Sequence, residues 1–113
     1  NAKSTLGGNT ALHRAGENGN PGAIRTLLHR GIDYNAKNFF GNTALHIAAK
    51  KGHAKAVKIL LDGRVDMFSC NTEDKTAMDL AQDNGHDNIV AVLEETVEVR
   101  LFWLGTLRFV PCS

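Results

Sequence analysis

A repeat of 33 residues constrains the fold of this chain more than any other feature of its sequence. Sliding the sequence against itself by 33 positions aligns GNTALHRA (residues 8–15), GNTALHIA (41–48) and DKTAMDLA (74–81). The register continues through rows of matching residues: Gly19, Gly52 and Gly85; Ile24, Val57 and Val90; Leu27, Leu60 and Leu93. A fixed period of this length is typical of stacked supersecondary units, each of which buries its apolar face only against its neighbours.

Each unit shows the local signals of a helix, a turn and a second helix. In the second unit Thr43 is a suitable N-cap, Leu45 and the alanines after it lie at helical spacing, and Gly52 can end the helix in the left-handed conformation. A second helix is then expected through residues 57–61. In the first unit Gly31 closes that second helix, and a loop leads on to the next turn glycine.

These residues resemble the ankyrin repeat family, whose signature is GxTPLHxAAxxGH, an apolar helix and then LLxxGAxxN. The resemblance covers about residues 8–96 and is closest over residues 41–61, where Ala44 replaces the proline of the signature. It implies an all-α repeat solenoid of stacked helix-turn-helix pairs with projecting β-hairpin loops.

The register divides the chain into an ankyrin repeat domain, residues 1–96, and a C-terminal tail, residues 97–113. The repeats are expected at about 8–40, 41–73 and 74–96. Asn1-Ala2-Lys3 echoes Asn35-Ala36-Lys37, so residues 1–7 are expected to end a preceding hairpin of a longer array. The tail alternates briefly and is then apolar through residue 104, which fits a strand or helix covering the last repeat, the first element of another domain, or a cloning remnant.

The second hairpin departs from the pattern of the first. Gly63-Arg64 stands where the first unit has Arg30-Gly31, and Phe68 stands where it has Asn35. We therefore expect this hairpin to be distorted.

The third unit is more polar than the other two. Asp79, Gln82 and Glu94 occupy positions at which the pattern has His, Ala and Leu. A polar outer surface is what a terminal, capping repeat requires.

The formal net charge of +1 hides an asymmetry along the chain. Residues 1–61 carry nine Lys or Arg against two acids, a net charge of +7, whereas residues 62–98 carry two against ten, a net charge of −8. In a linear array these segments form an axial dipole, and the basic half favours an acidic protein partner.

Several partner classes receive no support from the sequence. No run approaches the roughly 20 apolar residues of a membrane span, so we expect no membrane partner. The lysines within residues 50–58 lack any RNP, zinc-finger or recognition-helix pattern, so nucleic acid is not expected either. Cys70 and Cys112 form no CxxC pair, and we interpret both as reduced thiols of an intracellular, cytoplasmic or nuclear protein.

The histidines admit a metal-binding interpretation and a structural one. His13 and His46 occupy the TxLH position, and His53 and His86 the GH position, with Cys70 between them in sequence. A metal site needs ligands that converge at about 2 Å from one ion, whereas the family architecture spaces equivalent positions one repeat apart. We therefore expect the imidazoles to bond turn or neighbouring backbone, with no metal and no cofactor.

Two Thr-x-x-His pairs, Thr10 with His13 and Thr43 with His46, place a hydroxyl one helical turn from an imidazole, as a nucleophile and its base would be. The recurrence of the pair favours a scaffold bond. No nucleophile elbow, GxGxxG, Walker or HExxH motif accompanies it. We expect no enzyme activity and no small-molecule substrate.

The resemblance implies a non-catalytic protein–protein interaction module, a scaffold or adaptor, that binds a protein partner through hairpin tips and the concave helix face. The alternative is a regulatory ankyrin segment of a larger enzyme or channel. The family's variable positions map here to Phe39, Phe40, Asn42, Thr72, Glu73 and Lys75 at the tips, and to Glu17, Asn18, Lys50, Lys51, Asp83 and Asn84 on the concave helices.

Asn35 resembles the hairpin asparagine that an asparaginyl hydroxylase modifies in many ankyrin proteins. The other interpretation is that its side chain caps the hairpin by local hydrogen bonding.

Phe39 and Phe40 are adjacent, and one core cannot easily take both rings because neighbouring side chains point in different directions. We expect an exposed contact pair at the hairpin tip. The alternative is that one ring folds back on the neighbouring hairpin, near Phe68 or Tyr34.

Overall fold

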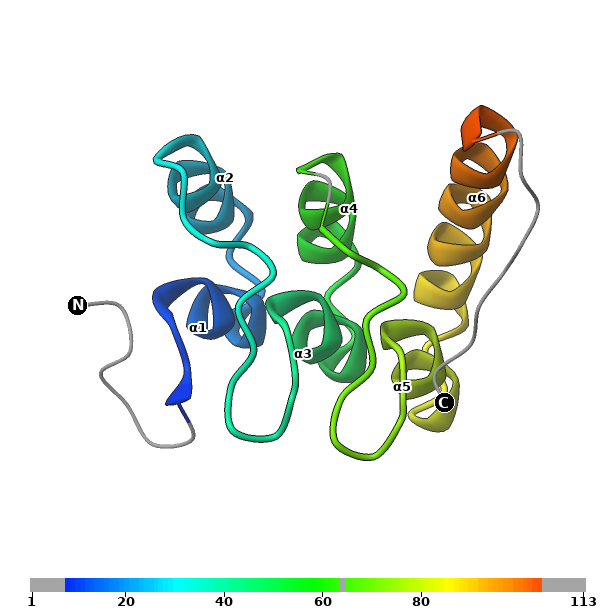
Figure 1. Ribbon diagram of the computed structural model, residues 1–113, viewed down its shortest axis with the longest axis horizontal. Helices are drawn as coiled ribbons and strands as arrows, with labels where there is room; N and C mark the ends of the chain where they lie inside the picture. The colour runs from blue at the N-terminus through cyan, green and yellow to red at the C-terminus, as the bar shows by residue number, and fades with distance from the viewer. Residues whose placement is uncertain (1–7, 64, 105–113) are drawn as a thin grey trace.

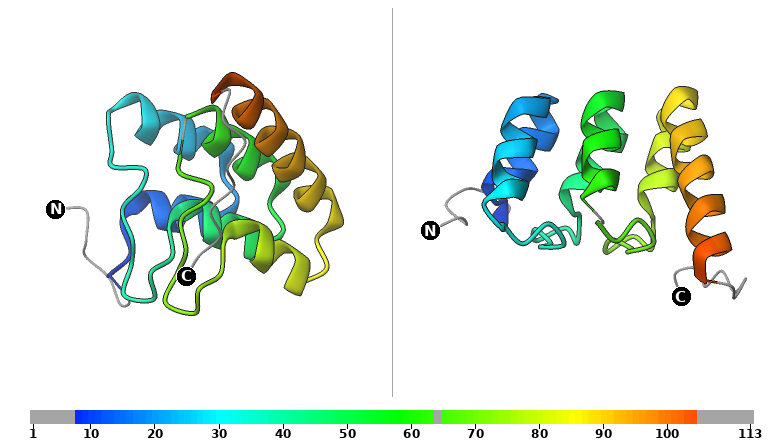
Figure 2. Two further views of the ribbon diagram at one scale, coloured as in Figure 1. Left: turned by 45° about the vertical axis from the view of Figure 1, so that its right-hand side comes forward. Right: turned by 90° about the horizontal axis from the view of Figure 1, so that it is seen from above.

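Three helix pairs stand side by side in the order of the sequence (Figure 1). The computed structural model describes residues 8–63 and 65–104, with side chains up to residue 96. Its helices are α1 (Ala11–Asn18), α2 (Pro21–His29), α3 (Ala44–Lys51), α4 (Ala54–Asp62), α5 (Ala77–Asp83) and α6 (Asp87–Leu104). The inner helices α1, α3 and α5 pack in one layer and the outer helices α2, α4 and α6 in a second (Figure 2). The prediction of an all-α repeat solenoid is confirmed.

The inner helices begin alike because the sequence places a threonine at the same position of each unit. Thr10, Thr43 and Thr76 are N-caps in extended conformation, and each side chain accepts a hydrogen bond from the N–H three residues later. That bond satisfies a backbone donor that has no partner within the helix. The N-cap expected at Thr43 is therefore confirmed, and Thr10 and Thr76 cap their helices in the same way.

The core lies between adjacent helix pairs. In the second unit Leu45, Ala48, Val57 and Leu60 are fully buried, because units on both sides cover them. Each helix pair thus depends on its neighbours for burial, which spreads stability along the array.

The projecting loops are hairpin-shaped, but no β-strand occurs in the described part of the chain, so the expected β-hairpins lack a strand ladder. In the first loop the Asn38 N–H donates to the Asn42 carbonyl at 3.0 Å. The Asn38 side-chain oxygen accepts from the N–H groups of Phe40 at 2.9 Å and Asn42 at 3.0 Å. The side chain therefore supplies an acceptor that a partner strand otherwise provides.

The described hydrogen bonds of the second hairpin follow those of the first and do not show the expected distortion. The Val65 N–H donates to the Leu60 carbonyl, as the Ile32 N–H donates to the Leu27 carbonyl 33 positions earlier. The Asp66 carboxylate then accepts from the Phe68 N–H at 3.0 Å, as Asp33 does from Asn35 at 3.1 Å. The aspartates hold both loops through backbone donors, which Phe68 offers as well as Asn35 does. Arg64 lies outside the described residues.

The structure describes only the first part of the predicted C-terminal tail, residues 97–104. α6 continues to Leu104, so residues 97–104 are helical rather than extended. The expected hairpin end at residues 1–7, and residues 105–113 with Cys112, lie outside the described residues.

Cys70 is disulfide-bonded, so the expectation of a reduced thiol is wrong for that residue. No helix in the described ranges is long and apolar enough to cross a membrane.

Candidate functional site

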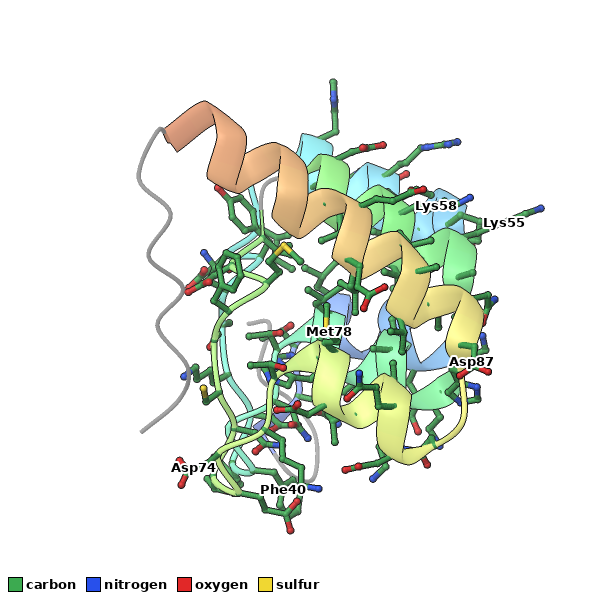
Figure 3. All side chains as sticks on the ribbon, turned by 90° about the vertical axis from the view of Figure 1, so that its right-hand side faces the viewer. Phe40, Lys55, Lys58, Asp74, Met78 and Asp87 are labelled. Atoms are coloured by element: carbon green, nitrogen blue, oxygen red, sulfur yellow. The ribbon has the colours of Figure 1, made fainter. Side chains whose placement is uncertain are left out.

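The loop between α2 and α3 carries two exposed aromatic rings at its tip. Phe39 is 77% exposed and Phe40 is 62% exposed. Figure 3 places Phe40 at the end of the loop, away from the helices. Phe39 also leans on the preceding loop, because a β-carbon built on Gly8 would lie 2.7 Å from Cδ1 and Cε1 of its ring. The ring covers the Gly8 backbone and leaves most of its own surface open.

The tip of the next loop is polar and partly engaged within the molecule. The N–H and hydroxyl of Thr72 donate to the Phe40 carbonyl at 3.1 and 3.0 Å, which ties the two tips together. Lys75 forms an ion pair with Asp83 of α5, and this bond raises the pKa of Lys75. Glu73 is exposed. Of the tip residues expected to contact a partner here, Thr72 and Lys75 therefore also serve the scaffold.

Asparagine side chains form a second link between loops. Asn38 donates to the side-chain oxygen of Asn9 at 2.9 Å, and Asn71 donates to that of Asn42 at 3.0 Å. Asn42 is thus half-buried and bonded. Asn38 and Asn71 are not among the residues predicted from the sequence. Their signal was available, since they lie 33 positions apart and three residues before the turn position.

The expected concave-face residues lie at the C-terminal ends of the inner helices, and all are exposed: Glu17, Asn18, Lys50, Lys51, Asp83 and Asn84. Equivalent positions of successive units form rows along the array. One row runs Glu17, Lys50, Asp83 and so alternates in charge. The basic side chains of this face are therefore concentrated on α3.

The TxLH histidines bond as expected, and each uses both ring nitrogens. In the second unit His46 Nδ1 accepts from the Thr43 N–H at 3.0 Å, and Nε2 donates to the Lys75 carbonyl of the next loop at 3.0 Å. In the first unit His13 makes the same pair of bonds, to Thr10 at 2.9 Å and to the Asn42 carbonyl at 2.8 Å. The imidazoles are fully engaged by scaffold, which leaves neither nitrogen of a Thr-x-x-His pair open as a base.

Burial lowers the pKa of His46, and the Lys75 carbonyl opposes this effect. The lowered pKa fits the bonding pattern, because an imidazolium would turn a second donor toward the Thr43 N–H. In the third unit Asp79 replaces the histidine, and its carboxylate accepts from the Thr76 N–H at 3.0 Å. The cap therefore survives this replacement.

The GH histidines bond in the opposite direction along the array. His53 Nε2 donates to the Glu17 carbonyl at 2.9 Å, and His86 Nε2 donates to the Lys50 carbonyl at 3.0 Å. α1 and α3 are therefore each bonded to the following unit near both of their ends. Within the described residues no group of three His, Cys, Asp or Glu side chains is placed to hold a metal ion.

Asn35 links the two hairpins. Its side-chain oxygen accepts from the Asp66 N–H at 2.8 Å, and the residue is exposed. The bond crosses between hairpins, whereas the sequence suggested a local cap. Hydroxylation of Asn35 stays a prediction.

The lysine cluster of the sequence is divided between two sides of the molecule. Lys50 and Lys51 end the inner helix α3, whereas Lys55 and Lys58 lie on the outer helix α4. Figure 3 shows Lys55 and Lys58 on the far side of the helices from the tip at Phe40. The cluster therefore does not form one surface.

Helix pairs stacked at a fixed period, with loops projecting from one side, define a helical repeat protein. The family model for ankyrin repeats (many copies) matches residues 3–48 and 27–81, and the chain belongs to the ankyrin repeat family. Ankyrin repeats are generally protein–protein interaction modules and are typically non-catalytic. Comparison with curated proteins gives no match.

Proposed function

We propose that this protein is a non-catalytic interaction module whose hairpin tips and concave face bind a protein partner, with Phe39 and Phe40 at the centre of the contact. The observation that carries the proposal is their exposure of 77% and 62%. Among residues with described side chains they are the two large apolar ones left exposed. Aromatic rings supply large, rigid contact area and dominate binding hot spots.

The remaining predicted residues would surround this aromatic centre. Thr72 and Glu73 extend the surface to the next tip, and the row through Glu17, Lys50 and Asp83 lies on the inner helices. Lys50 and Lys51 favour an acidic patch on the partner opposite α3, flanked by basic groups opposite Glu17 and Asp83. Asn42 and Lys75 contribute mainly by holding the loops in place.

Identification of the partner comes first in the test. Proteins of the source cell retained by the immobilised wild-type chain, and lost with Phe39→Ala/Phe40→Ala, are identified by mass spectrometry. A purified candidate is then titrated calorimetrically. The double variant should bind at least about tenfold more weakly, near 1.4 kcal/mol, while its melting temperature changes by less than about 2 °C, because exposed side chains contribute little to stability.

A matched control changes two exposed residues on the other side of the helices. Lys55→Ala/Lys58→Ala should bind the partner as the wild type does. If the phenylalanine variant binds normally, or unfolds several degrees earlier and binds normally once folded, the rings are structural and the proposal is wrong.

We also propose that Asn35 is hydroxylated. The exposed side of Asn35 makes the residue accessible to an enzyme. Peptide mass spectrometry of protein isolated from its source should show a mass increase of one oxygen at Asn35, and an unmodified residue would refute that part.

A further inference from the structure

The first helix pair has a face at the start of the row that no other described helix covers (Figure 1). This N-terminal end face consists of Ala11 and Ala15 on α1 and Ala23 and Leu27 on α2. Ala11 is exposed, and Ala23 and Leu27 are half-buried. An open depression of about 540 Å³ lies over these four residues, with Asn18 and Asn20 at its edge.

The equivalent faces of the second and third units show what kind of surface packs against such a face. The equivalent residues of the second unit are Ala44, Ala48, Ala56 and Leu60, and those of the third are Ala77, Ala81, Ile89 and Leu93. All eight are 0–1% exposed. In each case the cover is the preceding helix pair, since α3 packs on α1 and α4 on α2, and α5 and α6 pack on α3 and α4. The same residue types in the first unit have no such cover from the described residues.

The opposite end of the array differs. There the third unit has Met78, Gln82, Val90 and Glu94, at positions where the second unit has Leu45, Ala49, Val57 and Leu61. Gln82 and Glu94 are exposed, and Figure 3 shows Met78 on this end face between α5 and α6. The polar replacements suit a face that ends an array. The N-terminal end face has no polar replacement among its four residues.

The interface between the first and second units indicates which shape and chemistry a helix pair covering the N-terminal end face needs. Against Ala44 the array places Gly16, whose built β-carbon would lie 3.0 Å from the Ala44 carbonyl oxygen. The contact is therefore close, and small residues on both sides permit it. A second copy of this chain would bring Gln82 and Glu94 to the face, and burying an unpaired carboxylate is costly. Residues 1–7 are too few for a helix pair, which spans Ala11–His29 in the first unit.

We propose that the N-terminal end face is a docking surface for one further ankyrin-type helix pair, supplied ahead of residue 1 and presenting an apolar face like that of the second unit. The proposal is independent of the partner bound at the tips. It assigns the two ends of the array different roles, one extended and one capped.

The test adds a unit to the full chain. A copy of residues 41–66 is joined directly to Asn1, so that with residues 1–7 it completes one 33-residue period. The matched control carries Ala49→Gln and Leu61→Glu in the added copy only, which reproduces the polar pattern of Gln82 and Glu94. The apolar fusion should raise the melting temperature by at least about 5 °C, whereas the control should change it by less than about 2 °C. Equal melting temperatures for the two fusions would overturn the proposal.

Single substitutions in the unextended chain give a second measure. Leu27→Glu should be tolerated within about 2 °C, because the face is open, whereas Leu60→Glu at the equivalent buried position should unfold the protein. In the apolar fusion Leu27→Glu should remove the gain in melting temperature. If Leu27→Glu is as damaging as Leu60→Glu without the added unit, the face is already covered. Concentration-dependent dimers abolished by Leu27→Glu would identify a second copy as the occupant, and either result refutes the proposal.

Discussion

Replacing His46 with alanine tests the account of how adjacent units are joined. The ring is 1% exposed and lies between the N-cap of α3 and the following loop. It accepts from the Thr43 N–H at 3.0 Å and donates to the Lys75 carbonyl at 3.0 Å. The alanine variant loses both bonds and leaves the space of the imidazole empty.

The expected loss of stability follows from the groups left behind. An unsatisfied buried polar group costs about 1–3 kcal/mol. The Thr43 N–H is deeply buried, whereas the Lys75 carbonyl belongs to a half-buried residue that water can partly reach. Taking about 1.5 kcal/mol for the first, about 1 for the second and about 1 for lost packing gives about 3.5 kcal/mol in all. A loss of that size lowers the melting temperature of a small domain by roughly 10–20 °C.

Thermal and urea unfolding followed by circular dichroism measure this loss, with His29→Ala as control. His29 is exposed on α2, and its replacement should change stability by less than about 0.5 kcal/mol. If His46→Ala melts within about 3 °C of the wild type, the imidazole is not a joint between units and the reasoning fails.

The same variant should also change the pH dependence of stability. Burial lowers the folded-state pKa of His46 below its ordinary value of 6.5. Between these two pKa values, His46 is therefore protonated in the unfolded chain and neutral in the folded chain. The contribution of the neutral ring is therefore present above about pH 6.5 and is lost as the pH falls toward the folded-state pKa. His46→Ala should reduce this acid-side slope by up to about 1.4 kcal/mol per pH unit. An unchanged slope would contradict the assignment.

Three further outcomes are expected. Gly41→Ala should destabilise the protein more than Gly8→Ala in urea titrations, since both glycines have φ 75° but the new β-carbon meets the Thr72 backbone in one case and the movable Phe39 ring in the other; equal losses would argue against that contact. Lys50→Glu with Lys51→Glu should slow association with an acidic partner at low salt, as measured by stopped flow, and an unchanged rate would end the steering hypothesis. Deletion of residues 41–73 should leave a poorly folded remainder, because too few units remain to bury a continuous core; a cooperative melt of unchanged midpoint would count against it.

The sequence predicted local structure better than it predicted contacts between units. Thr43 and Gly52 mark the ends of α3 because their roles depend only on backbone a few residues away. The hydrogen-bond acceptor of His46 Nε2, by contrast, depends on how the next loop is folded. The period of 33 residues identifies the neighbouring unit but not which of its carbonyl groups accepts the bond. The Lys75–Asp83 ion pair was likewise hidden, since the two residues are eight positions apart, on either side of the start of α5.

The described hydrogen bonds of the second hairpin do not show the expected distortion, for a related physical reason. The prediction compared side chains, Phe68 with Asn35, whereas the loop is held by the Asp66 carboxylate and backbone donors. The position of Phe39 over Gly8 could not be read from the sequence either, because it depends on the distance between successive tips. The exposure of both rings was predictable from the sequence, because two adjacent side chains before a turn cannot share one core.

The two rows of histidine bonds have a consequence for how a partner is selected. One row joins α1 and α3 to the loop that follows each of them, through His13 and His46, and the other joins the next unit back to the end of the same helix, through His53 and His86. A rotation that opened one row would strain the other, so we expect little hinge motion between neighbouring units. The spacing between the Phe39–Phe40 tip and the next is then set before any partner arrives. A ligand whose contact groups have the same spacing as the tips binds without any ordering of the module. A ligand with a different spacing cannot be accommodated by induced fit.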